Sequence, residues 1–311
     1  MFHPNTRRFR RKGRCDDILL LMRRFVDLHT HSTASDGAFP PAEVIRLAEA
    51  QQLAAVALTD HDTAAGLAEA RVAAGEFPQL CFVPGIELSA KFSPGTLHII
   101  GLGINDQAPA LRRLTRQLVD ARNDRNPRII ARLQEMGLAI EMDDVLAVVS
   151  PGAGRWGGEI VGRVHIAEAL RQKGQVRTTQ EAFDRYIGNG GLAYVDKERL
   201  GPAEVISAIH EAGGLAALAH PMQLQCDNSA QLERVAGDLK AAGLDGIEVY
   251  HSDHSHTKTR LYMDLAKRLK LEVGGGSDFH GHVKPNVRLG RPSVPISALG
   301  KTVSQRLLGS R

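Results

Sequence analysis

Six histidines and three carboxylates stand where short apolar runs of the chain end. Some occur in compact groups, namely Asp27-Leu28-His29-Thr30-His31, Ser35-Asp36-Gly37, Thr59-Asp60-His61-Asp62 and Gly276-Ser277-Asp278-Phe279-His280. Glu87, His98 and His220 end further runs of this kind. Imidazole and carboxylate together suit Mn, Fe or Zn, and bridging carboxylates let ions sit ~3.5–4 Å apart. The pattern predicts a multinuclear metal site that activates water.

A single motif of this kind is weak evidence, but the whole set is not. His29 and His31 share one face of an extended segment, because side chains alternate along a strand. The alternative is that these histidines cap strands or fill the mouth of a barrel. Buried polar clusters without a metal would leave unsatisfied groups, so we favour the metal site.

Strand-like and helical runs alternate along the chain and predict the frame that carries these residues. The expected strands are Phe25–Leu28, Ala54–Thr59, Leu80–Glu87, Leu97–Ile104, Gly214–Ala219, Gly246–Tyr250 and Leu271–Gly276. The expected helices between them are Pro41–Gln52, Thr63–Ala74, Pro202–Ala212 and Ser229–Ala242. Seven strands separated by helices favour a parallel α/β barrel, which gathers functional side chains at the carboxyl ends of its strands.

One stretch interrupts this alternation. From residue 105 to residue 196 the sequence predicts helices only, at 108–136 (one helix or two), 142–149, 161–173 and 179–186. We therefore expect a helical insertion (cap) domain over 105–196, between barrel segments 25–104 and 197–311, a size suited to a small domain. Its first part is rich in arginine.

Composition narrows the class of protein. The chain has 311 residues, 43% of them hydrophobic, which suits one large α/β domain with an insertion. The apolar run Ile18–Met22 is too short for a membrane span or a signal peptide. Cys15, Cys81 and Cys226 share no metal or disulfide spacing, which indicates free thiols and a cytoplasmic location.

The basic charge belongs to the first residues. The net charge is +4, but residues 1–24 carry eight Lys/Arg and two Asp, so the rest of the chain is slightly acidic. We expect 1–24 to be a disordered tail. It is either a basic arm for RNA or sequence ahead of a true start at Met22, and we favour the second interpretation.

The motif set resembles the PHP superfamily, named for polymerase and histidinol phosphatase. Its signature of H-x-H, T-D-H, Glu, H-P and D-x-H is matched by His29/His31, Asp60/His61, Glu87, His220/Pro221 and Asp278/His280, and Asp36 and His98 fill the remaining positions. The resemblance, from Phe25 to about Arg291, implies a distorted (β/α)7 barrel of the TIM-like kind. It also implies three divalent ions, often Mn²⁺, with Zn or Fe as alternatives.

The resemblance further implies which residues hold each ion. The first ion is expected on His29, His31, Glu87 and Asp278, the second on Glu87, His98 and His220, and the third on Asp36, His61 and His280. Glu87 would bridge, and Glu87, Asp278 and His220 would be the central catalytic residues.

A closer resemblance is to one branch, the nucleoside 3′,5′-bisphosphate phosphatases that also act as 5′→3′ exoribonucleases. It rests on Asp36, on the insertion after the fourth strand, and on two insertion motifs, Arg122-Asn123-Asp124-Arg125 and Gly162-Arg163-Val164-His165. It implies that Arg122, Asn123, Asp124, Arg125 and Arg163 bind a substrate phosphate, which guanidinium pairs with bidentately. The alternative for each arginine is a solvated helix face. Pro127 departs from the pattern and predicts a kink, with Arg128 as an extra contact.

The implied activity is hydrolysis at the 3′-oxygen of 5′-phosphorylated nucleotides. The expected substrates are nucleoside 3′,5′-bisphosphates and short 5′-phosphorylated RNA, which would release 5′-mononucleotides, with no obligatory protein partner and no membrane. One alternative is another PHP phosphomonoesterase, of the histidinol-phosphate type, which would not need the arginines. The other is a non-catalytic PHP module, which usually lacks several ligands.

Four further residues or groups carry weaker signals. Glu248 is expected to orient a ligand or an arginine, and His165 either contacts the base or packs as a buried polar residue. His251, His254 and His256 are expected in a surface loop, and His282 is near the site in sequence only.

Overall fold

The computed structural model describes residues 24–149, 161–197 and 199–308. The predicted disordered tail and the alternative start at Met22 therefore lie outside the described residues.

One sheet of eight strands forms the centre of the molecule, in the order β7-β6-β5-β4-β3-β2-β1-β8. The strands are β1 (Phe25–Asp27), β2 (Ala55–Leu58), β3 (Cys81–Ala90), β4 (Leu97–Leu102), β5 (Leu215–Leu218), β6 (Gly246–Tyr250), β7 (Glu272–Gly275) and β8 (Val294–Pro295). All seven predicted strands are present, with bounds that differ by a few residues.

The expected all-parallel arrangement is wrong around β4. This strand runs antiparallel to both β3 and β5. Residues 91–96, which join β3 to β4, are too few for the crossover of roughly a dozen or more residues that parallel strands require. Because β4 is reversed, its first residues lie beside the carboxyl ends of β3 and β5, and this reversal brings His98 to the site. The unpredicted β8 pairs antiparallel with β1.

The sheet closes on itself between the segments that follow β1 and β7. Leu28 N donates to Gly275 O at 3.2 Å, and Asp278 N donates to the carbonyl oxygen of His29 at 2.9 Å. Thr30 also forms a bridge to Phe279. The result is a nearly closed barrel in which the first and last ligand motifs of the chain are neighbours.

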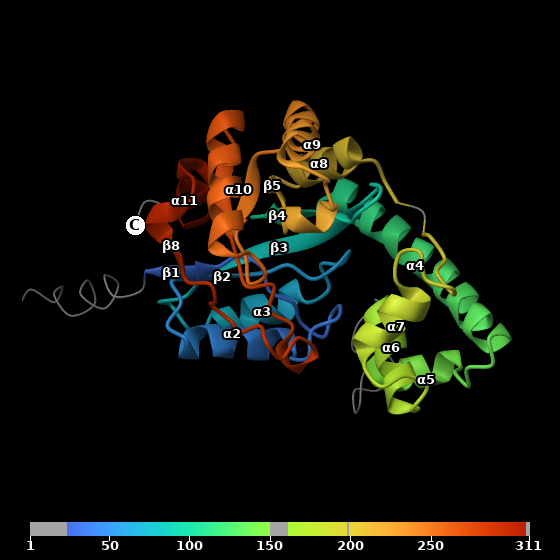
Figure 1. Ribbon diagram of the computed structural model, residues 1–311. Coiled ribbons are helices and arrows are strands. Elements are labelled where there is room, and N and C mark those ends of the chain that lie inside the picture. Colours follow the sequence, from blue (N-terminus) through green and yellow to red (C-terminus); the bar gives the residue numbers. More distant parts are fainter. Residues whose placement is uncertain (1–23, 150–160, 198, 309–311) are drawn as a thin grey trace, which may run out of the picture.

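Helices surround the barrel (Figure 1). They are α2 (Pro41–Ala50), α3 (Leu67–Ala74), α8 (Pro202–Glu211), α9 (Ser229–Ala241), α10 (His256–Leu269) and α11 (Lys301–Leu308), with short helices η2 (Pro221–Leu224), η3 (Gly281–Val283) and η4 (Ile296–Ala298). Local sequence sets several starts: Pro41 opens α2, and the side chains of Asn228 and Ser255 cap α9 and α10. The helix α10, with His256 at its first position, was not predicted.

Two apolar clusters lie on opposite faces of the strands. Val56, Leu58 and Ile86 pack against the surrounding helices. Val83, Ile100 and Leu102, which alternate with them, form a second cluster with residues of α11. Glu87 and His98 share the strand faces of Val83 and Ile100, because side chains two or four apart on a strand point the same way. The candidate ligands therefore stand above an apolar floor.

Between β4 and β5 the described residues form helices: α4 (Pro109–Glu135), α5 (Met142–Val149), α6 (Arg163–Gln172), α7 (Thr179–Ala182) and the π-helix η1 (Phe183–Ile187). Figure 1 shows α4 running from the barrel to the group formed by α5, α6 and α7. This group has a hydrophobic cluster of its own, drawn from residues 129–195. The division of the chain into barrel and insertion domain remains our interpretation of these elements.

The helix α4 is continuous through Pro127. Its buried stripe is apolar at both ends, with Leu114 against the barrel core and Ile129 in the insertion cluster. Between these ends the stripe is polar, and it consists of Arg122, Arg125 and Asn126. Two buried arginines thus lie where the helix passes from barrel to insertion. Among the described residues, none of the helices is both long and apolar enough to cross a bilayer.

Candidate metal centre

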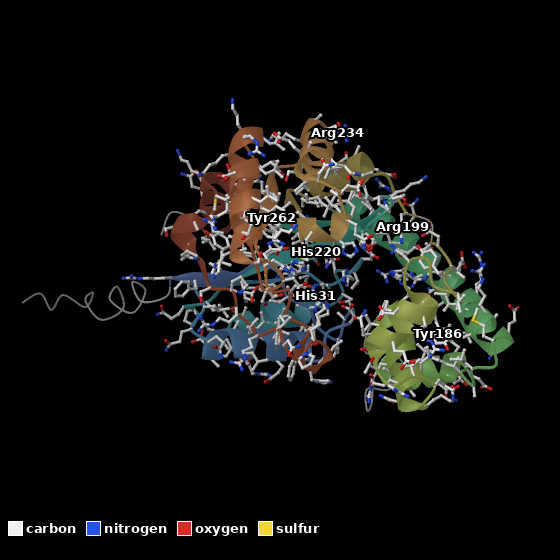
Figure 2. All side chains as sticks on the ribbon, in the orientation of Figure 1. His31, Tyr186, Arg199, His220, Arg234 and Tyr262 are labelled. Atoms are coloured by element: carbon white, nitrogen blue, oxygen red, sulfur yellow. The ribbon has the colours of Figure 1, made fainter. Side chains whose placement is uncertain are left out.

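Glu87 lies at the centre of the candidate site. Its Oε2 lies 3.3 Å from Nε2 of His29, 3.3 Å from Nε2 of His31 and 3.0 Å from Nδ1 of His61. Its Oε1 lies 2.9 Å from Nδ1 of His98 and 2.8 Å from Nε2 of His220. Figure 2 labels two of these histidines, His31 and His220. One fully buried carboxylate therefore faces two groups of histidines, one with each oxygen.

Asp278 and Asp36 complete the set on one side of Glu87. Oδ1 of Asp278 lies 3.3 Å from Nε2 of His31 and 3.5 Å from Nε2 of His29. Asp36 lies 3.3 Å from Nε2 of His280 and 3.8 Å from Nε2 of His61. The structure thus brings all nine predicted ligands together, although the assignment of three ions to them remains a prediction.

The backbone explains why these side chains converge. Thr30, between His29 and His31, turns the other way and donates from its hydroxyl to Ala57 O at 2.6 Å. His61 forms an isolated parallel bridge with Glu87 beyond the end of β2. His220 has a φ of 24°, a rare conformation for a residue with a side chain. This bend directs the imidazole into the barrel mouth directly after β5.

The donor set fits divalent cations. Several buried atoms of the centre have no hydrogen-bond partner: Nε2 of His29, both ring nitrogens of His31, Nδ1 of His61 and Oε2 of Glu87. Buried polar atoms in proteins are rarely left unsatisfied, and here they face one another, which is the arrangement that cations satisfy. Although burial alone would raise it, His61, His98 and His29 hold the pKa of Glu87 well below its ordinary value. Glu87 is therefore an ionised carboxylate.

A second cluster, of buried and half-buried cations, lies beside the centre. Arg122 donates from Nε to Oδ2 of Asp62 at 2.9 Å, and Lys197 donates from Nζ to the same oxygen at 2.8 Å. Arg125 donates from Nη2 to Oδ1 of Asn126 at 2.8 Å. Arg163 donates to Ile187 O at 2.9 Å. With Arg199, these residues make up what we call the cation cluster: Arg122, Arg125, Arg163, Lys197 and Arg199.

The cation cluster has more positive charge than its neighbours balance. In the part of the chain that the structure describes, neither Arg125 nor Arg163 forms an ion pair with a carboxylate. Burial and the nearby Arg122, Arg163 and Arg199 lower the pKa of Arg125 to about 9. Burial and Arg122 likewise lower the pKa of Lys197 to about 7. Buried and mutually repelling cations indicate a site for an anion.

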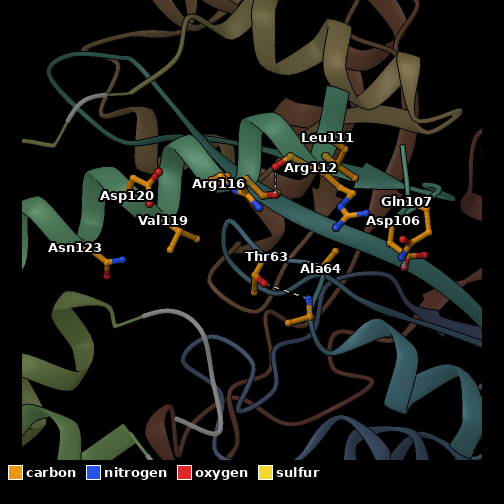
Figure 3. A pocket seen from close by; sticks show the side chains of 12 residues that line it. Thr63, Ala64, Asp106, Gln107, Leu111, Arg112, Arg116, Val119, Asp120 and Asn123 are labelled. Atoms are coloured by element: carbon orange, nitrogen blue, oxygen red, sulfur yellow. Dashed lines mark hydrogen bonds between the residues drawn. The ribbon is translucent and has the colours of Figure 1, made fainter. Parts of the chain in front are cut away.

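Two of the predicted substrate-binding residues do not join this cluster. Asn123 and Asp124 are exposed, as is Arg128, because they follow buried positions of α4 by one or two residues and so lie on other faces of the helix. Asn123 instead lines a groove of about 670 Å³ along α4, with Arg112, Arg116 and Thr63 among its other residues (Figure 3). This groove contains none of the nine candidate ligands.

Comparison with known sequences decides the family. The sequence pattern of the PHP domain matches residues 27–188. The chain belongs to the PHP family. It is 37% identical over 257 residues to the 3′,5′-nucleoside bisphosphate phosphatase of Chromobacterium violaceum, covering 82% of this chain and 87% of that protein. It is 34% identical to the 5′-3′ exoribonuclease of Haemophilus influenzae, covering 83% and 91%.

Other relatives and solved structures agree with a PHP fold. The phosphoribosyl 1,2-cyclic phosphate 1,2-diphosphodiesterase of Eggerthella lenta is 34% identical, with 82% of this chain and 94% of that protein covered. A metal-dependent phosphoesterase of Bifidobacterium adolescentis superimposes with a TM-score of 0.78 at 31% identity, over 91% of this chain and 95% of that one. A Chromobacterium violaceum structure, described as an amidohydrolase with bound sulfate, gives 0.77 at 34% identity, over 88% and 94%. The predicted family and fold class are confirmed.

Around the PHP ligands, Glu248 and His251 form a supporting layer. Glu248 accepts from Nδ1 of His29 at 3.1 Å and from the backbone N of His220 at 2.7 Å. The expected surface position of His251 is wrong: the residue is 1% exposed, and its Nε2 lies 3.5 Å from Oδ2 of Asp278. His251 follows β6 directly, so it enters the mouth of the barrel with the strand. His256 is exposed as expected, and His254 is half-buried.

Four more functional candidates were given no role of their own from the sequence. Asp60, part of the T-D-H motif, accepts hydrogen bonds from Ser32 and Ser35 and so holds the loop between His31 and Asp36. Lys284 lies with Nζ 2.6 Å from Oδ2 of Asp278. Lys197 and Arg199 belong to the charged run 196–199, where the chain re-enters the barrel. That charged run could have indicated these residues, since it lies where the predicted insertion ends and the barrel resumes.

The predicted role of His165 stays open between base contact and packing. The residue is buried, and its Nδ1 accepts from Gly162 N at 3.1 Å, which caps the start of α6. Burial lowers its pKa, which also depends on Asp36 and Arg122. The charges of Asp36 in the metal centre and of Arg122 in the cation cluster therefore both act on His165.

Proposed function

We propose that this PHP protein is a metal-dependent phosphoesterase that cleaves the phosphate ester at the 3′-oxygen of 5′-phosphorylated nucleotides. Its substrates are nucleoside 3′,5′-bisphosphates and short 5′-phosphorylated RNA, which is the activity named for its relatives from Chromobacterium violaceum and Haemophilus influenzae. From these proposed substrates we infer a cytoplasmic location.

The observation that carries the proposal is the pairing of two sites by adjacent residues. His61 contacts Glu87 in the metal centre, and the next residue, Asp62, contacts Arg122 and Lys197 in the cation cluster. A nucleotide with a phosphate on each side of its ribose presents two phosphates, one for each of these neighbouring sites. The cation cluster would bind the 5′-phosphate through Arg122, Arg125 and Arg163, and the metal centre would receive the phosphate on the 3′-oxygen.

The metal centre would hold three divalent ions. Its mixed imidazole and carboxylate donors suit Mn, Fe or Zn, and we favour Mn²⁺ because the family resemblance implies it. When bound, these ions supply activated water and positive charge against the phosphate oxygens. Glu87, as an ionised and fully buried carboxylate between two groups of histidines, would keep the ions in fixed positions. Asp278 and His220 would complete the set nearest the reacting phosphate.

This arrangement accounts for two activities with one site. A phosphomonoester on the 3′-oxygen is removed as inorganic phosphate, and the enzyme acts as a phosphatase. A phosphodiester at the same position joins the next nucleotide, and its cleavage releases a 5′-mononucleotide from RNA. The newly exposed end again carries a 5′-phosphate, so the reaction repeats along the chain.

The alternatives make different use of the cation cluster. A phosphomonoesterase of the histidinol-phosphate type would not need Arg122, Arg125 and Arg163, and a non-catalytic module would not need nine converging candidate ligands. The Eggerthella lenta relative is named for a phosphoribosyl cyclic phosphate substrate. This substrate also contains a ribose joined to phosphate.

The decisive experiment compares four substrates with the purified full chain in the presence of Mn²⁺. They are a nucleoside 3′,5′-bisphosphate, a 5′-phosphorylated oligoribonucleotide, the same oligoribonucleotide with a 5′-hydroxyl, and histidinol phosphate. We expect fast release of phosphate from the first, of 5′-mononucleotides from the second, and poor turnover of the others. A preference for histidinol phosphate, or equal turnover of both oligoribonucleotides, would overturn the proposal.

A further inference from the structure

Asp62 stands between the two sites and contacts both. We propose that Asp62 is a positioning residue that fixes the cation cluster at a set distance from the metal centre and thereby creates the preference for a 5′-phosphate. The inference rests on the proposed function, and it concerns a residue that was not among the predicted ligands or substrate contacts.

On the barrel side, Asp62 is joined to the strand that carries Glu87. Its backbone N donates to the carbonyl oxygen of Glu87 at 2.8 Å. Its Oδ1 accepts from Ser89 N at 2.8 Å, and its Oδ2 lies 3.1 Å from the hydroxyl of Ser89. Both the backbone and the carboxylate of Asp62 are therefore held by β3, within two residues of the central carboxylate.

On the insertion side, the same carboxylate holds two cations from segments distant in the sequence. Oδ2 accepts from Nε and Nη2 of Arg122 on α4 and from Nζ of Lys197. Asp62 is fully buried, so these charge-assisted contacts are shielded from water. The two cations have little freedom to move relative to β3.

The backbone at Asp62 has a conformation that serves this arrangement. Its φ is 57°, in the left-handed region that residues with side chains adopt rarely. Consecutive side chains can then serve different partners: His61 faces Glu87, and Asp62 faces Arg122. Such a conformation persists only where the surrounding structure determines it, and here the Ser89 and Glu87 contacts do so.

The neighbouring cations explain why the position of Arg122 and Lys197 affects substrate binding. Arg125 and Arg163 have no carboxylate partner in the described residues and are free to pair with a substrate phosphate, whereas Arg122 and Lys197 are already anchored. Without the Asp62 carboxylate, Arg122 and Lys197 would repel each other and the other arginines. The cation cluster would then lose its arrangement while every phosphate-binding residue remained in the chain.

The test uses Asp62→Asn, which keeps the size of the side chain and removes its charge. The matched control is Asp106→Asn, because Asp106 also pairs with an arginine, Arg71 at 2.8 Å, but lies outside both sites. For each protein with Mn²⁺, kcat and KM are measured on 5′-phosphorylated and 5′-hydroxyl oligoribonucleotides and on p-nitrophenyl phosphate. Bound manganese and the affinity for a nucleoside 5′-monophosphate are measured alongside.

For Asp62→Asn we expect the ratio of kcat/KM between the 5′-phosphorylated and 5′-hydroxyl substrates to fall by roughly 10- to 100-fold, mainly through KM. Affinity for the 5′-monophosphate should fall in parallel, manganese content should stay near the wild-type value, and the generic phosphate ester should be affected far less. Asp106→Asn should match the wild type throughout.

Two results would overturn the inference. One is an unchanged substrate ratio in Asp62→Asn; the other is a loss of manganese with equal loss on every substrate, which would make Asp62 a support of the metal centre alone. If Asp62→Asn does not fold, Asp62→Glu carries the test, since it keeps the charge and moves it by one methylene, and a wild-type ratio in it would refute positioning. A wild type with no preference for 5′-phosphate would instead refute the proposed function, whatever the variants show.

Discussion

Glu248 lies with Oε1 3.1 Å from Nδ1 of His29, and this contact determines which nitrogen of His29 is available to the metal centre. The other nitrogen, Nε2, faces Glu87 and Asp278. A carboxylate behind a ligand histidine fixes the tautomer and the ring orientation and makes the imidazole a better ligand.

From this contact we predict that Glu248→Gln weakens manganese binding by roughly 10- to 100-fold without unfolding the protein. The amide cannot stabilise the same tautomer, and the backbone N of His220 also loses a charged acceptor. Titration of the metal-free protein with Mn²⁺ measures the effect. Glu233→Gln, which removes an exposed carboxylate paired with Arg268, is the control. Equal affinities in the two variants would show that Glu248 has no role in the metal site.

Glu87→Gln should lower turnover by several orders of magnitude and should abolish metal binding, while the protein remains folded. The Glu87 carboxylate faces both groups of histidines, and an amide cannot supply the negative charge that neutralises two cations. Metal analysis and circular dichroism are the measurements beside turnover. Treatment of the wild type with a chelator should produce the same loss, restored by Mn²⁺. Turnover near the wild-type level in Glu87→Gln at saturating manganese would exclude a bridging role.

Arg163→Ala should reveal recognition of the 5′-phosphate. Loss of one charge-assisted contact costs roughly 1.5–3 kcal/mol, or about 10- to 150-fold in kcat/KM on 5′-phosphorylated RNA. On 5′-hydroxyl RNA and p-nitrophenyl phosphate the loss should be far smaller. Arg128→Ala is the matched control, because Arg128 is an exposed arginine of α4. If Arg163→Ala abolished generic hydrolysis and kept the 5′-phosphate preference, the arginine would belong to the chemical step or to stability.

From the lowered pKa of Lys197 we predict that the preference for a 5′-phosphate depends on pH. Burial and Arg122 lower its pKa to about 7, so its charge is lost as the pH rises through about 7. The 5′-phosphate is already doubly ionised above about pH 6, so it does not compensate. The kcat/KM ratio of 5′-phosphorylated to 5′-hydroxyl RNA should therefore fall between about pH 6.5 and 8.5, and metal-ligand ionisation should cancel from that ratio.

The stability effect of the same lysine has the opposite sign. Between about pH 7 and 10 the unfolded chain holds more protons on Lys197 than the folded protein does, so the free energy of unfolding should rise with pH over this window. Lys197→Met should remove both effects. A substrate ratio that depends on pH as strongly in Lys197→Met as in the wild type would assign the titration to another group.

The local motifs were enough to predict most of the strands and the nine candidate ligands that the structure brings together. His29 and His31 share one face of an extended segment because of the period of two, and apolar runs mark the strands that precede His61 and His220. The shared position of Arg122 and Arg125 could also be predicted, since a spacing of three places both on one helix face. These features depend on short-range geometry, which one sequence already contains.

The tertiary structure alone decided how distant segments meet. The reversal of β4 put His98 at the site from the start of its strand, and the closure of the barrel placed His29 beside Asp278. Asp62 and Lys197, 135 positions apart in the chain, meet because α4 and the returning segment converge on one carboxylate. Local periodicity predicts on which face of its own helix or strand a side chain lies. Only the pairing of helices and strands determines which residues of other elements that side chain contacts.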